Sequence, residues 1–236
     1  MTQAPTPGHP GGQLWLELPP LSAQAPRRLL VFLHGAGSRP EAFAPVAIAW
    51  QLKFPGATVA ILQGLRESAG GHSHDWYDGS GIATERLERV DRAALTVGER
   101  VALLQAGTGI GPERTVLIGF SQGATVALQV VRNRPGLCAI AVAYAGRLAA
   151  PIRPGERIGA DIHLVHGELD SIVPVVHARQ ALRGLSAAGA RVTLDIDAEG
   201  SHTIDQEGVI LGTTRVLQTI FRGRRPPRNE RPRRLH

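Results

Sequence analysis

The sequence contains a single cysteine, Cys138, and therefore cannot form an internal disulfide. One cysteine in 236 residues is typical of a reducing compartment, so we expect the protein in the cytoplasm. Cys138 lies in the apolar run 137–143. That setting favours a small core residue over a nucleophile.

Long apolar stretches are also absent. No run of 18 or more apolar residues occurs, which predicts that no segment spans a membrane. Residues 1–12 (MTQAPTPGHPGG) lack the charged and apolar regions of a secretory signal. Hydrophobic residues make up 43% of the sequence, and no repeat or internal linker is visible. These features favour one globular domain.

The net charge of +6 is confined to one end of the chain. From Arg222 to His236 there are seven arginines and one glutamate, which account for all of it. The remaining residues carry 19 basic and 19 acidic groups, so the body gives no reason to require a nucleic-acid partner. We expect a disordered N-terminus at 1–12, a folded domain at 13–222 and a basic, Pro/Arg-rich disordered tail at 223–236.

The body alternates short β-rich runs with helical patterns, which is typical of a mainly parallel sheet. Several runs are continuously apolar, as strands buried on both faces should be. The predicted strands are 13–18, 28–34, 57–63, 114–120, 137–144, 161–166 and 191–196. Apolar residues spaced by three and four predict helices around 87–104 and 209–221, and Pro174 is expected to open a helix to about residue 188.

Residues Gly119-Phe120-Ser121-Gln122-Gly123 match the pattern G-x-S-x-G. The apolar strand 115–118 leads into this motif, and a helical segment, 124–134, leads out of it. This context is that of a nucleophile elbow, a sharp turn that raises the serine hydroxyl above the sheet. A side chain at position 119 or 123 would collide with the neighbouring strand or helix. We therefore predict that Ser121 is a nucleophile.

A serine nucleophile requires a base, and the base requires an orienting acid, both expected downstream in the order serine, acid, histidine. Asp170 follows the strand 161–166 at the carboxyl edge of the sheet, and it is our candidate acid. Glu168 in the same loop is the alternative. His202 follows the last strand and is the candidate base. His163 and His166 are expected to make packing or backbone contacts instead.

The strand 28–34 ends in the glycine-rich turn His34-Gly35-Ala36-Gly37. Such a turn lets backbone N–H groups approach a substrate closely and stabilise an oxyanion. We predict that the N–H groups of Ala36 and Gln122 form the oxyanion hole. His72 and His74 have no third ligand at recognisable spacing, so we predict no metal. Acyl transfer by a serine, a histidine and an acid needs no cofactor, so we predict none.

Four segments can be taken together: Leu33-His34-Gly35-Ala36-Gly37, the elbow at 119–123, His166-Gly167-x-x-Asp170-x-x-Val173-Pro174 and Gly200-Ser201-His202. This set of motifs resembles the carboxylesterase/phospholipase family, which includes the acyl-protein thioesterases. The resemblance covers nearly all of residues 28–221. Within the family, the chain looks closer to a bacterial esterase branch than to the acyl-protein thioesterases. It implies an α/β-hydrolase fold. The sequence itself predicts about seven strands with helices on both faces, and the chain is too short to carry a large cap domain, so we expect none. By the same resemblance, Trp76 in Asp75-Trp76-Tyr77-Asp78 is a candidate substrate-binding residue.

These observations predict a serine carboxylesterase that acts on small or single-chain acyl esters through an acyl-enzyme. A thioesterase or lysophospholipase could use the same residues, because all three reactions transfer an acyl group to water. An anion- or nucleic-acid-binding protein built on an inactive hydrolase scaffold is the alternative of another class. The sequence does not fix the oligomeric state and is compatible with a homodimer.

Overall fold

The structure of the protein is a computed structural model that describes residues 15–23, 25–68 and 70–222. The terminal segments expected to be disordered, 1–12 and 223–236, lie outside the described residues.

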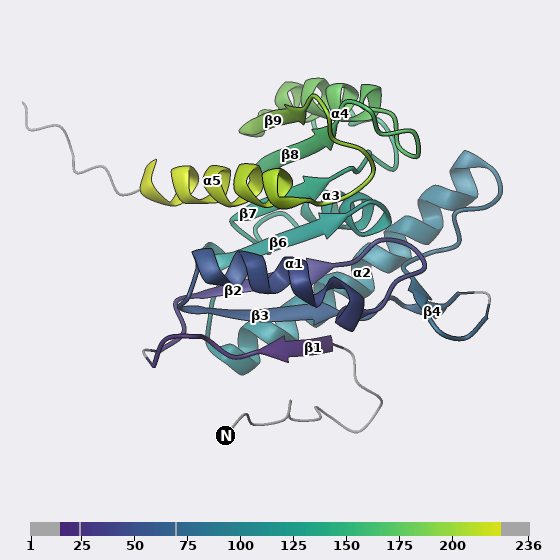
Figure 1. Cartoon of the computed structure of the whole chain (residues 1–236). Coiled ribbons are helices and arrows are strands. Elements are labelled where there is room, and N and C mark those ends of the chain that lie inside the picture. The colour runs from purple at the N-terminus through teal and green to yellow at the C-terminus, as the bar shows by residue number, and fades with distance from the viewer. Residues whose placement is uncertain (1–14, 24, 69, 223–236) are drawn as a thin grey trace, which may run out of the picture.

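One seven-stranded sheet forms the centre of the molecule, with strand order β1-β3-β2-β6-β7-β8-β9 (Figure 1). Edge strand β1 is antiparallel to β3, and the other neighbours are parallel. The strands are β1 (Trp15–Leu18), β2 (Arg28–Leu33), β3 (Ala57–Leu62), β6 (Thr115–Phe120), β7 (Ile140–Tyr144), β8 (Asp161–Gly167) and β9 (Val192–Asp197). All seven predicted strands are present, which confirms the prediction of a mainly parallel sheet.

Helices cover both faces of this sheet (Figure 1). Helices α1 (Pro40–Lys53) and α5 (Gln206–Arg222) pack on one face, where Phe32 of β2 contacts Phe43 and Trp50. Helices α2 (Ala83–Thr108), α3 (Gln122–Asn133) and α4 (Val176–Ala187) pack on the other face. The strands between these layers are buried on both sides, which explains their continuous apolar sequences. None of the helices in the described ranges is both long and apolar enough to cross a bilayer.

Four parts of the fold differ from the sequence prediction. A short hairpin of β4 (Arg66–Glu67) and β5 (His74–Asp75) and helix α1 were not anticipated by the hydrophobic pattern, and a 3₁₀ turn, η1 (Pro112–Arg114), precedes β6. Helix α4 begins at Val176, two residues after Pro174. Pro174 instead accepts a hydrogen bond from the His177 N–H at 3.0 Å, in the turn that leads into the helix.

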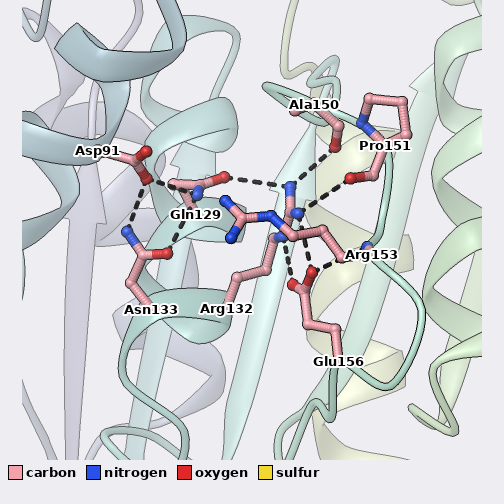
Figure 2. Close-up of polar contacts among 8 residues, drawn as sticks. All are labelled: Asp91, Gln129, Arg132, Asn133, Ala150, Pro151, Arg153 and Glu156. Carbon is pink, nitrogen blue, oxygen red and sulfur yellow. Dashed lines mark hydrogen bonds and ion pairs between the residues drawn. The ribbon is translucent and has the colours of Figure 1, made fainter.

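The long connection between β7 and β8 is held by Arg132 of α3, whose side chain is buried (Figure 2). The guanidinium donates to both carboxylate oxygens of Glu156, at 2.6 and 3.1 Å. It also donates to the carbonyls of Ala150 (2.8 Å) and Pro151 (3.1 Å) and to Gln129 Oε1 (3.3 Å). All five N–H groups of Arg132 therefore have acceptors, and the connection is fixed against α3.

Candidate active site

Ser121 occupies the turn between β6 and α3, at the carboxyl edge of the sheet. Its backbone has φ 54° and ψ −114°, a strained conformation for a residue with a side chain. An ideal Cβ at Gly119 would lie 2.5 Å from the Gly123 carbonyl oxygen, and one at Gly123 would lie 2.3 Å from that of Leu33. The turn therefore requires glycine at both positions, for the steric reason expected from the sequence.

Three side chains from separate loops form a continuous chain of hydrogen bonds. His202, between β9 and α5, has Nε2 2.9 Å from Ser121 Oγ and Nδ1 2.8 Å from Asp170 Oδ2. A carboxylate can only accept, so Nδ1 of neutral His202 carries the proton and Nε2 is free to accept one from the serine. The residues predicted as nucleophile, base and acid thus lie within hydrogen-bonding distance of one another.

The carboxylate of Asp170 is buried and held from both sides. Its Oδ1 accepts hydrogen bonds from the N–H groups of Ile172 (2.9 Å) and Val173 (2.8 Å). Burial raises the pKa of Asp170, but these bonds and the bond from His202 outweigh that effect, so its pKa lies below the usual value. Glu168, the alternative acid, instead pairs with Arg179 at 2.8 Å on the exposed side of the loop.

His166 makes the backbone contact expected of it and also lies against the acid. Its Nε2 donates to the Val173 carbonyl at 2.7 Å and is 3.3 Å from Asp170 Oδ2. Burial lowers the pKa of His166, which keeps the ring neutral with the proton on Nε2. The sequence assigned it no role at the site, although its spacing of four residues from Asp170 was visible.

The loops that carry Asp170 and His202 are packed directly on each other. The Glu168 N–H donates to the Asp197 carbonyl at 2.8 Å, and the Leu169 N–H donates to the Gly200 carbonyl at 2.9 Å. An ideal Cβ at Gly167 would lie 2.3 Å from the Gly200 carbonyl oxygen. This close approach sets the position of the acid relative to the base.

The turn after β2 packs against the elbow. An ideal Cβ at Gly35 would lie 3.6 Å from Ser121 Cβ, so the turn that contains Ala36 borders the serine. Gln122 is the first residue of α3, and its backbone N–H has no partner within the helix. The helix dipole adds partial positive charge at the same point. The two predicted oxyanion donors thus belong to segments that meet beside Ser121.

Trp76 lies behind this turn, with 2% of the residue exposed. Its indole Nε1–H donates to the His34 carbonyl at 2.7 Å, and its ring centroid is 5.1 Å from that of His34. The ring therefore offers little surface to a substrate in this structure. His74 lies in β5 with Nε2 3.0 Å from Gln63 Nε2, and the described ranges contain no cluster of three His, Cys, Asp or Glu residues arranged to hold a metal ion.

A parallel sheet with a serine, a histidine and an aspartate in hydrogen-bonded contact at its carboxyl edge is typical of α/β-hydrolases. Comparison with known proteins identifies the family. The profile of the Phospholipase/Carboxylesterase family matches residues 21–211, and the chain belongs to that family. It is 33% identical to Esterase YpfH of Escherichia coli (strain K12) over 195 residues, which cover 82% of this chain and 84% of that protein.

Solved structures agree with this assignment. The crystal structure of esterase PE8 aligns with a TM-score of 0.79 at 30% identity, covering 86% of this chain and 96% of that chain. The carboxylesterase of Bacillus cereus aligns with a TM-score of 0.72 at 18% identity, covering 86% and 93% respectively, and so shares the fold. The expected α/β-hydrolase fold is confirmed.

Proposed function

We propose that the protein is a serine carboxylesterase that hydrolyses small or single-chain acyl esters through an acyl-enzyme on Ser121. The observation that carries this proposal is the hydrogen-bond chain from Ser121 Oγ through His202 to Asp170, with distances of 2.9 and 2.8 Å. Family membership and the esterases among its relatives support the same reaction class.

In the proposed cycle, Ser121 Oγ attacks the ester carbonyl while His202 Nε2 takes the hydroxyl proton. Asp170 keeps the imidazole in the required tautomer and stabilises its positive charge. The carbonyl oxygen becomes an oxyanion that accepts hydrogen bonds from the N–H groups of Ala36 and Gln122. Collapse of this intermediate expels the alcohol, which receives the proton from His202.

The acyl-enzyme is then hydrolysed by the same groups in reverse roles. His202 removes a proton from water, the resulting hydroxide attacks the acyl carbon, and the second intermediate returns the proton to Ser121 as the acid leaves. The proposed cycle uses only protein groups and water. A thioester or a lysophospholipid could enter the same cycle, because only the leaving group differs.

The test combines covalent labelling with a substitution. A fluorophosphonate should label the wild-type protein on Ser121, and Ser121→Ala should abolish labelling and lower kcat by about 10⁴- to 10⁶-fold without changing the fold. Near-wild-type hydrolysis by purified Ser121→Ala would refute the assignment. Absence of labelling and of hydrolysis in the wild type would favour the alternative of a binding protein on an inactive scaffold.

A substrate panel separates the related activities. We expect p-nitrophenyl esters of short acyl chains to be hydrolysed with higher kcat/KM than an acyl-CoA or a lysophospholipid. The opposite order would favour the thioesterase or lysophospholipase alternative. The cytoplasmic location and the homodimer stay predictions, to be checked by cell fractionation and by light scattering.

A further inference from the structure

The segment Asp75-Trp76-Tyr77, at the end of β5, contacts both halves of the proposed oxyanion hole. On one side, it holds the turn after β2. The Gly37 N–H donates to Asp75 Oδ1 at 2.8 Å, and the Trp76 indole donates to the His34 carbonyl at 2.7 Å. These two bonds fix the backbone immediately before and after Gly35 and Ala36.

On the other side, the segment is bound by the side chain of Gln122. Gln122 Oε1 accepts the Trp76 backbone N–H at 2.7 Å, and Gln122 Nε2 donates to the Tyr77 carbonyl at 2.9 Å. Both ends of the carboxamide are therefore used. Trp76 and Tyr77 are themselves buried, so these bonds are shielded from competing water.

We infer that the Gln122 carboxamide is a positioning group for the oxyanion hole, acting through the Asp75–Tyr77 segment. This inference rests on the proposed function, in which the N–H groups of Ala36 and Gln122 bind the oxyanion. The main chain of Gln122 supplies one donor, while its side chain, through Trp76, fixes the turn that supplies the other.

The physical reason is that an oxyanion hole works by preorganisation. Donors must already lie near 2.7–3.1 Å from the position that the oxyanion will take, and a displacement of about 1 Å can cost roughly 10²-fold in rate. The two donors here come from loops that follow different strands, β2 and β6. A hydrogen-bonded bridge between the loops limits their relative movement.

The test uses Gln122→Ala, which deletes the carboxamide but keeps the backbone N–H. We expect kcat for p-nitrophenyl acetate to fall about 10- to 100-fold while KM changes less than about threefold. Affinity for a trifluoromethyl ketone, whose adduct with Ser121 places an oxyanion in the hole, should fall by the same factor as kcat/KM. The pH at which kcat/KM is half-maximal on the acid side should not move, because the contacts of His202 are untouched.

Gln129→Ala is the matched control, since Gln129 lies two turns further along α3 than Gln122. Figure 2 shows Gln129 with its polar partners. Its amide is also engaged, donating to Asp91 Oδ1 at 2.7 Å and to Asn133 Oδ1 at 3.1 Å. Neither of these bonds involves the Asp75–Tyr77 segment. We expect this variant to keep kcat/KM within twofold of wild type, whatever it does to the melting temperature.

Trp76→Phe provides a second test, which can be carried out even if Gln122→Ala fails to fold. It keeps an aromatic ring but removes the donor to His34, and we expect kcat to fall about 3- to 10-fold. In the double variant with Gln122→Ala, the fold reduction in kcat should be smaller than the product of the two single reductions, because both substitutions break the same bridge.

The inference is overturned if Gln122→Ala and Trp76→Phe both keep kcat/KM and inhibitor affinity within twofold of Gln129→Ala, while Ser121→Ala is inactive. That result would leave the proposed function intact. Activity retained by Ser121→Ala would instead overturn the proposed function, and this inference with it.

Discussion

Asp170 and Glu168 belong to the same loop, yet only Asp170 reaches an imidazole. Its carboxylate is 2.8 Å from His202 Nδ1, whereas Glu168 pairs with Arg179 at 2.8 Å on the surface. The sequence alone left both as candidate acids, because side chains two residues apart in an irregular loop have no predictable directions. The hydrogen bonds of Asp170 to Ile172 and Val173 give it its direction.

We predict that Asp170→Asn lowers kcat by about 10⁴-fold, because an amide at this position favours the wrong tautomer of His202. Glu168→Gln should change kcat less than about threefold, since an exposed ion pair contributes little. Steady-state assays of the two variants on one ester make the comparison. The reverse ranking would show that the loop presents Glu168 to the histidine in solution.

The positions of site residues were predictable where a motif fixes the backbone and unpredictable where a contact joins distant segments. Ser121, Asp170 and His202 each follow a recognisable strand, so their common edge could be read from the sequence. The side chain of Gln122 and the indole of Trp76 have partners 46 and 42 residues away. No local pattern gives such pairings.

Among the elements, the central strands were predictable because they are short, apolar and buried on both faces. Helix α1 was not, since Pro45 within it removes a backbone donor and its apolar residues form no single stripe. The β4–β5 hairpin has two residues in each strand, which is too few to show alternation. It is nevertheless the element that leads into Asp75 and Trp76.

The connection between β7 and β8 gives a prediction on stability and pH. Glu156→Gln should lower the free energy of unfolding at pH 7 by about 1–3 kcal/mol, because it leaves buried Arg132 without its counter-charge. The hydrogen bond from Arg132 holds the pKa of Glu156 below the usual value of 4.5. A lowered pKa stabilises the fold above the unfolded pKa, and this contribution is lost as the pH falls through the folded pKa. The difference between wild type and variant should therefore shrink below about pH 4.5.

Urea denaturation at pH 7 and at pH 3.5 measures this difference. Glu113→Gln is the control, because Glu113 also pairs with an arginine, Arg114, but on the exposed surface. It should have little effect at either pH. An unchanged difference between wild type and Glu156→Gln at the two pH values would count against a charge-dependent anchor.

For the whole molecule, the direction of α5 carries the described part of the chain away from the edge of the sheet that holds Ser121. The helix begins at Gln206, close after His202, and its 17 residues carry the chain about 25 Å away to Arg222. Figure 1 shows it running along the sheet. Arg222, the last described residue, thus lies at the end of α5 away from Ser121.

We therefore predict that deletion of residues 223–236 leaves kcat/KM for a neutral short-chain ester within about twofold. Any affinity for polyanions should be lost with the deletion and should weaken with salt in the full-length protein, since the deleted segment holds six arginines and one glutamate. Assays of both proteins on p-nitrophenyl acetate and on a heparin column test this. Loss of esterase activity with an unchanged circular dichroism spectrum would show that the tail acts at the site.

The three side chains of the hydrogen-bond chain come from the ends of β6, β8 and β9, and Ser121 and His202 are 81 residues apart. During synthesis, a ribosome-bound chain that already contains the elbow still lacks His202, the proposed base, which follows the last strand. In the proposed mechanism, hydrolysis therefore requires that β9 has already joined the sheet, and such long-range strand pairing forms slowly. Recovery of activity after dilution from denaturant is then expected to report completion of the sheet.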